Sequence, residues 1–218
     1  MHKKELAKRY LVFLVGLVFN AFGVAFVTDA ALGTSPIAAI PYTLSLILPN
    51  LSMGTWVIIF NLALVLIQFA IEGKSAHKLQ LLLEAGVTVL FGYGIDLSRF
   101  CLQAFRPDFY PLQLVSLLVG CCIIACGAYL EVVANVVMLA GDAFVNAIAK
   151  RIHRSYGGVR MVSDISMTVI AGALCLLFLH ELSGVREGTI LSALLVGNLV
   201  KVLGKVSPHF GERLFGTC

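Results

Sequence analysis

The chain has 218 residues, of which 59% are hydrophobic and 13% are charged, and its mean hydropathy is +0.95. Soluble domains are nearer half apolar and a quarter charged, and they could not hide this much apolar surface from water. The composition therefore excludes a soluble domain and predicts an all-α polytopic membrane protein. The net charge of +4 comes without a basic soluble face, so no nucleic-acid partner is expected.

Six apolar stretches are each about 20 residues long, enough for a helix to cross roughly 30 Å of hydrocarbon. They lie at residues 10–28, 53–71, 79–100, 111–132, 159–179 and 188–206. Each is predicted to be a transmembrane helix, because a lipid-exposed backbone finds no water to bond. The first is longer than the apolar core of a signal peptide, so we expect it to remain uncleaved. Two further apolar segments, 36–48 and 143–152, are too short to span upright and either re-enter the membrane or lie at its interface.

The sixteen basic residues divide unevenly between the two sides of these spans. With the N-terminus inside, thirteen fall in the inner segments and only Arg99, Arg106 and Arg186 fall outside. Inner loops of membrane proteins carry an excess of Lys and Arg. This bias predicts that both the N- and the C-terminus are cytoplasmic.

The two halves of the chain share weak similarities at a nearly constant offset. "GLVFNAFG" (16–23) precedes "GCCIIACG" (120–127) by 104 residues. The other matched pairs, 103 residues apart, are Asn61 with Asp164 and Glu84 with Glu187. These matches predict two three-helix repeats, residues 1–107 and 108–218. Because three is odd, the repeats must be inverted relative to each other, an arrangement that recurs in secondary transporters with a site near the midplane.

Each predicted repeat has a break after its first span. "ALGTSP" (31–36) precedes one short apolar segment, and "NVVMLAGD" (135–142) precedes the other. Thr34 or Ser35 is predicted to cap a short helix that begins at Pro36, and Asp142 is predicted to cap the second. Starts of such helices within the membrane would present free N–H groups to an anion or polar group. Helices lying flat at the interface would be only lids or anchors.

The segment "ALGTSP" after a glycine-bearing first span, the "VSDIS" of the fifth span and six spans in 218 residues resemble the YczE/YitT-like integral membrane proteins of bacteria. The resemblance implies a multi-pass protein of the bacterial cytoplasmic (inner) membrane. It supplies no reaction or substrate.

Ionisable and amide groups at membrane depth are costly and mark candidate sites. The predicted solute-binding residues are Thr34, Ser35, Asn61, Asn135, Asp142 and Asn146, and the predicted coupling residues are Asp164 and Glu131. For Asp164 the alternative is an i,i+4 ion pair with Arg160. For the pairs around the second break it is an amphipathic interfacial segment. Glu84 and Glu187 are interpreted as charges that suit a helix start, and Asp96 is expected to pair with Arg99.

The sequence contains no P-loop, HExxH, GxSxG or Rossmann glycine pattern, and its cysteines and histidines lack ligand spacing. We therefore expect no enzymatic activity, cofactor or metal. The favoured hypothesis is a secondary transporter or facilitator of a small polar or anionic solute, coupled to protons or another cation. The alternative is a non-catalytic accessory protein of another membrane complex, in which buried polar residues bond only to one another and leave no cavity. The expected partners are the lipid bilayer, the solute and a second copy of the chain.

Overall fold

The structure is a computed structural model that describes residues 3–73, 78–105 and 107–206. Within these residues the chain forms eight α-helices and no β-strand. They are α1 (Lys3–Asp29), α2 (Pro36–Ile47), α3 (Met53–Glu72), α4 (Lys78–Cys101), α5 (Tyr110–Ala134), α6 (Ala140–Arg151), α7 (Tyr156–Phe178) and α8 (Glu187–Val206). All except α2 and α6 are long and apolar enough to cross a membrane. The predicted all-α architecture is confirmed, and each of the six predicted spans falls in one of these six long apolar helices.

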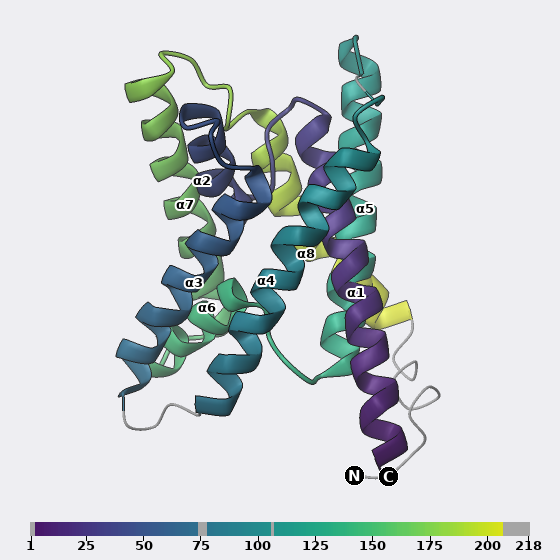
Figure 1. Cartoon of the computed structure of the whole chain (residues 1–218), viewed down its shortest axis with the longest axis vertical. Helices are drawn as coiled ribbons and strands as arrows, with labels where there is room; N and C mark the ends of the chain where they lie inside the picture. Colours follow the sequence, from purple (N-terminus) through teal and green to yellow (C-terminus); the bar gives the residue numbers. More distant parts are fainter. Residues whose placement is uncertain (1–2, 74–77, 106, 207–218) are drawn as a thin grey trace.

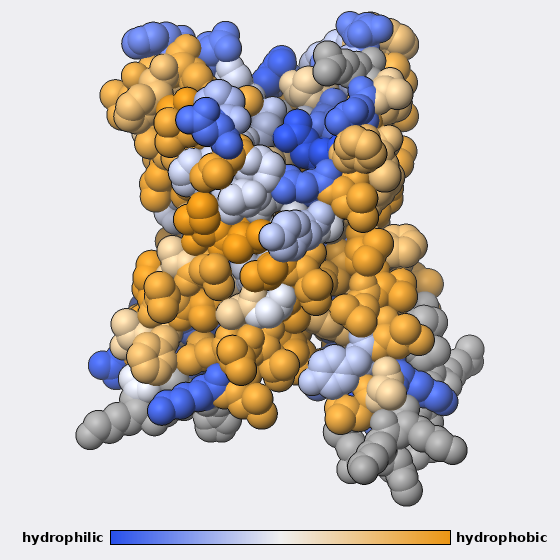
Figure 2. Space-filling view, viewed as in Figure 1, coloured by the Kyte–Doolittle hydropathy of each residue, from blue (hydrophilic) through white to orange (hydrophobic). Residues whose placement is uncertain are grey.

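The long helices run between two ends of the molecule, which we call the lower end, where α1 begins, and the upper end, where α1 finishes (Figure 1). The short helices occupy different halves, α2 the upper and α6 the lower. Figure 2 shows apolar side chains over most of this face. Hydrophilic side chains lie at both ends and around the notch at the upper end. A broad apolar surface of this kind suits a lipid environment.

Several helix contacts occur twice, once for each half of the chain. The pair α1 and α4 packs as α5 and α8 do, and α3 packs against α6 as α7 packs against α2. The contact of α2 with α3 likewise recurs between α6 and α7. One pairing differs, because α3 packs closely against α4 whereas the described parts of α7 and α8 share no comparable contact.

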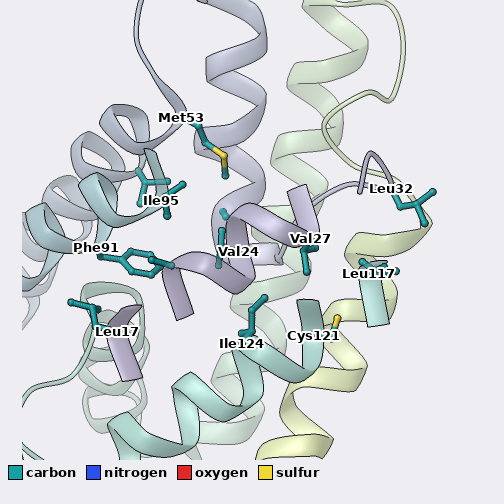
Figure 3. Close-up of a cluster of buried hydrophobic side chains, with 13 residues drawn as sticks. Leu17, Val24, Val27, Leu32, Met53, Phe91, Ile95, Leu117, Cys121 and Ile124 are labelled. Atoms are coloured by element: carbon teal, nitrogen blue, oxygen red, sulfur yellow. The ribbon is translucent and has the colours of Figure 1, made fainter. Parts of the chain in front are cut away.

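Helices α1 and α5 make the most extensive contact in the molecule, and glycine is the reason they approach so closely. A Cβ built on Gly127 would lie 2.7 Å from the carbonyl oxygen of Gly16, and one built on Gly23 would lie 3.2 Å from that of Gly120. The two glycine-bounded segments matched in the sequence therefore face each other. Beside them lies a core cluster in which α1 and α5 interdigitate, including Leu17, Val24, Val27, Leu117, Cys121 and Ile124 (Figure 3).

The two short helices begin beside each other in the interior. Gly141 in the first turn of α6 lies against the side chain of Ile37 in the first turn of α2. From there the helices diverge. The Thr43 hydroxyl of α2 lies 3.3 Å from the Cys175 thiol near the upper end of α7, whereas the last turn of α6 lies beside the lower end of α3. Their first turns thus share the centre of the molecule while their last turns lie toward opposite ends (Figure 1).

The starts of the short helices agree with the predicted caps in one case only. Ser35 is the N-cap of α2 and Pro36 its first residue, as predicted, although the Ser35 side chain makes no capping hydrogen bond. The prediction that Asp142 caps the second short helix is wrong. Helix α6 begins at Ala140 with Leu139 as its N-cap, and the Asp142 carboxylate is engaged by Arg160 instead.

Candidate functional site

Hydrogen bonds join the first break, residues 31–36, to the start of α8, and we call this contact the seal. The backbone N–H of Gly188 donates to the carbonyl oxygen of Leu32 over 2.9 Å, and the N–H of Thr34 donates to the Thr189 hydroxyl over 3.3 Å. The Thr34 hydroxyl lies 2.8 Å from that of Thr28, and both side chains are buried. Thr34, a predicted binding residue, therefore satisfies its polar atoms within the protein.

Close packing at this seal gives a stability prediction for Gly188→Ala. A Cβ at Gly188 would overlap the backbone carbonyl of Leu32, which cannot rotate away as a flexible side chain could. We expect a loss of about 1 kcal/mol, the lower end of what overpacking costs, because Leu32 lies between α1 and α2 and its backbone is not fixed by a helix. Thermal unfolding in detergent measures the change. Gly197→Ala is the matched control on the same helix, because a Cβ there meets nothing within 4 Å, and equal melting temperatures for the two variants would contradict the packing described.

Two other predicted binding residues keep unbonded polar atoms in the interior. Within the described residues, the Ser35 hydroxyl and the Asn61 carbonyl oxygen are buried without a hydrogen-bond partner. Ser35 lies at the start of α2, and Asn61 lies on the buried face of α3. Buried polar atoms are normally bonded, so each of these marks a place where a polar group from outside the protein could bind.

Around the second break, Glu131 and Asn135 have different environments. The Glu131 carboxylate accepts a hydrogen bond of 3.2 Å from the Asn20 amide across the α1–α5 interface, and both side chains are buried. Asn135 follows α5 as its C-cap in a left-handed conformation, with φ of 49°, and its N–H donates to the Glu131 carbonyl oxygen. Asn tolerates this conformation better than most residues, which explains its place at the helix end.

Asp142 and Asp164 meet at one cation. Arg160 of α7 forms an ion pair with Asp164 one turn later on the same helix, at 3.2 Å, and a second ion pair with Asp142 of α6. The Tyr156 hydroxyl donates to Asp142 over 3.2 Å. The i,i+4 pair weighed as the alternative for Asp164 is thus present, and it belongs to a network that joins α6 to α7.

Asp96 and Arg99 do not pair with each other in the way the sequence suggested. The Asp96 carboxylate accepts hydrogen bonds from the Ser52 hydroxyl and from the Gly54 N–H at the start of α3. Arg99 forms its ion pair with Asp29 at the end of α1, at 3.1 Å. Both residues therefore tie α4 to neighbouring helices, which spacing along one helix could not reveal.

A polar cavity of about 450 Å³ opens between α3, α4 and α6 at the lower end. Amide and charged side chains provide most of its lining, and Asn146 is the one predicted site residue among them. The lining residues are Gln68, Ile71, Glu72, Gln80, Ala143, Asn146, Ala147, Lys150, Arg151 and His153. The cavity therefore combines hydrogen-bonding amides with side chains of both charges.

A fully buried carboxyl group lies beside this cavity. The Glu84 carboxyl accepts a hydrogen bond of 2.8 Å from the Gln80 amide, and the Gln68 amide also lies within hydrogen-bonding reach of it. The Gln68 N–H donates to Glu72 over 3.3 Å. From the sequence, Glu84 is interpreted only as a helix-start charge, and Gln68 and Gln80 are missed. The sequence feature that could have indicated Gln68 is its i,i+7 spacing from Asn61, which places two amides on one face of α3.

The six apolar spans and their buried polar groups define a membrane-embedded helical protein. The chain belongs to DUF6198, a family of unknown function whose family model matches residues 7–205. No curated protein and no solved structure gave a significant match. The family match does not name the YczE/YitT-like group, so that resemblance stays a prediction. Among the described residues, no three His, Cys, Asp or Glu side chains gather in a way that could hold a metal ion.

Proposed function

We propose that this protein is a secondary transporter or facilitator of a small polar or anionic solute, which enters through the cavity between α3, α4 and α6. The observation that carries this proposal is the polar cavity itself, because a protein that only scaffolds another complex needs no such space. Gln68, Gln80 and Asn146 offer amide donors and acceptors to a solute. Lys150 and Arg151 add positive charge that favours an anionic group.

The proposed architecture is a pair of inverted repeats, residues 1–107 and 108–218, with α2 and α6 as re-entrant helices. Three observations support it: the recurring helix contacts, the glycines of α1 facing those of α5, and the meeting of the first turns of α2 and α6. Inverted-repeat transporters commonly place the solute where such half-helices meet.

We further propose that the lower end faces the cytoplasm of a bacterium. Among the described basic residues, those at the upper end are Arg99 and Arg186, whereas Lys150, Arg151 and others cluster at the lower end. The positive-inside rule favours this orientation. The cavity would then open inward while the first break, bonded to α8, closes the outer side. In the opposite state we expect α7 and α8 to adopt the close packing that α3 and α4 show here.

The accessory-protein hypothesis predicts buried polar residues that bond only to one another. The seal around Thr34 fits that description. The lower half does not, because it has a cavity and because Gln68 and Glu84 keep unbonded buried oxygens. The transport proposal therefore accounts for more of the molecule, with the bilayer and the solute as partners and with no enzymatic step.

A ligand screen tests the proposed function. Purified protein is heated with small organic acids, amino acids and inorganic anions, and a compound at a hundred times its dissociation constant should stabilise it by about 2.7 kcal/mol. Asn146→Leu should abolish this shift by removing a polar group from the cavity. Asn198→Leu, at an exposed position of α8, is the matched control. A stabilising compound should then enter proteoliposomes. Stabilisation that survives Asn146→Leu, or binding without uptake, would contradict the proposal.

A further inference from the structure

Glu84 occupies a position where a negative charge has no counter-charge in contact. The residue is 0% exposed. Of its two carboxyl oxygens, Oε1 accepts from Gln80, and Oε2 is buried with no partner in the described part of the chain. None of the ion pairs formed by the described residues includes Glu84. An ionised carboxylate placed this way is costly, and such groups tend to become neutral instead.

The charges around Glu84 do not supply the missing compensation. On α3, the carboxyl group that faces Glu84 is that of Glu72, and its negative charge repels a second negative charge on Glu84. From α6, Lys150 and Arg151 line the wall of the adjacent cavity, and His153 follows that helix. From α1 this part of α4 meets apolar groups, since Val87 packs with Phe13 and its neighbours. Among these described residues, the cations that offset the repulsion from Glu72 are those that line the cavity.

Gln68, like Glu84, has a buried oxygen without a hydrogen-bond partner in the described ranges. One N–H of its amide donates to Glu72 over 3.3 Å, and its carbonyl oxygen, Oε1, is buried with no donor among the described residues. Two buried acceptors, Gln68 Oε1 and Glu84 Oε2, thus lie on neighbouring side chains and both lack a hydrogen. A single proton on Glu84 Oε2 would donate to Gln68 Oε1 and satisfy both atoms at once.

We propose that Glu84 is a proton-binding site, held in this conformation as a neutral carboxylic acid that donates to Gln68, and that it is the coupling group of the transporter. The coupling role rests on the proposed function. Proton release breaks the O–H bond, passes the proton to water in the cavity and leaves a carboxylate. The Gln68 amide can then turn so that its N–H group donates to that carboxylate. The orientation of the Gln68 amide, which lines the cavity that binds the solute, therefore depends on whether Glu84 is protonated.

Infrared spectroscopy of the full chain in liposomes tests the protonation directly. Protonated carboxyl groups have a C=O stretching band distinct from the bands of carboxylates. Subtracting the spectrum of Glu84→Gln from that of the unaltered protein should isolate one such band, which is lost as the pH is raised. Gln68→Met, which removes the accepting oxygen, should shift the frequency of this band. Glu187→Gln is the control, because Glu187 is half-exposed and paired with Arg186, and its subtraction should yield no such band.

Absence of the Glu84 band at every pH would overturn the proposal and would mean that a turned Gln68 amide stabilises a carboxylate. The coupling role has a separate readout, proton influx into liposomes loaded with a pH-sensitive dye after addition of the stabilising compound from the screen. Glu84→Gln should abolish proton influx while equilibrium exchange of the compound continues. Unchanged proton influx in Glu84→Gln would reject the coupling role. A Glu84 band without any uptake of the compound would instead reject the proposed function and leave the protonation intact.

Discussion

Gly127→Ala is expected to destabilise the protein by about 3 kcal/mol, the upper end of what overpacking usually costs. A Cβ at this position would lie 2.6 Å from the backbone nitrogen of Asn20 and 2.7 Å from the carbonyl oxygen of Gly16. Both neighbours are backbone atoms of α1 and cannot move aside by changing rotamer. The only relief is separation of α1 from α5, which also lengthens the hydrogen bond between Asn20 and Glu131.

The experiment compares retention on size exclusion after heating in detergent. Gly86→Ala is the matched control, because it makes the same chemical change on a transmembrane helix where a Cβ meets nothing within 4 Å. Replacing Gly with Ala inside a helix is otherwise favourable by about 1 kcal/mol, so the control should be as stable as the unaltered protein or more stable. A Gly127→Ala variant that matches this control would show that α1 and α5 do not pack as described.

Most of the fold can be predicted because hydropathy reports directly on membrane-spanning helices. Each of the six predicted spans coincides with one of the observed long helices, and the break at residues 31–36 ends, as expected, in a helix that begins at Pro36. That start carries strong local signals, a hydroxyl residue followed by proline. The start of α6 carries none, since Leu139 is its N-cap, and Asp142 is a misleading local signal.

The polar interior is harder to predict because tertiary packing decides it. Glu84 lies in the second turn of α4, where sequence alone favours a charge that suits the helix dipole. Its burial depends on α3 and α6, which come from other parts of the chain. The partners of Asp96 and Arg99 are missed for the same reason, since both bond to other helices. Spacing along one helix cannot show which neighbour another helix will bring.

Arg160→Met is the second substitution for which we expect a large loss of stability. Arg160 is the shared cation of Asp142 and Asp164, so its removal leaves two carboxylates near each other without a counter-charge. Removing one partner of a fully buried ion pair costs about 3–5 kcal/mol. These side chains are 21–35% exposed, and solvent screening reduces the expected loss to about 1–2 kcal/mol. Thermal unfolding at low and high salt measures it, and the loss should be smaller at high salt.

The charge explanation is separated from simple loss of packing by removing the carboxylates as well. Adding Asp142→Asn and Asp164→Asn to Arg160→Met should recover most of the lost stability, because the triple variant has no unpaired charge in the network. Asp164→Asn alone should be mild, since Arg160 keeps Asp142 as its partner. That single variant also bears on coupling. If Glu84 carries the proton, Asp164→Asn should still support proton influx, whereas loss of influx in a stable Asp164→Asn protein would return the coupling role to Asp164.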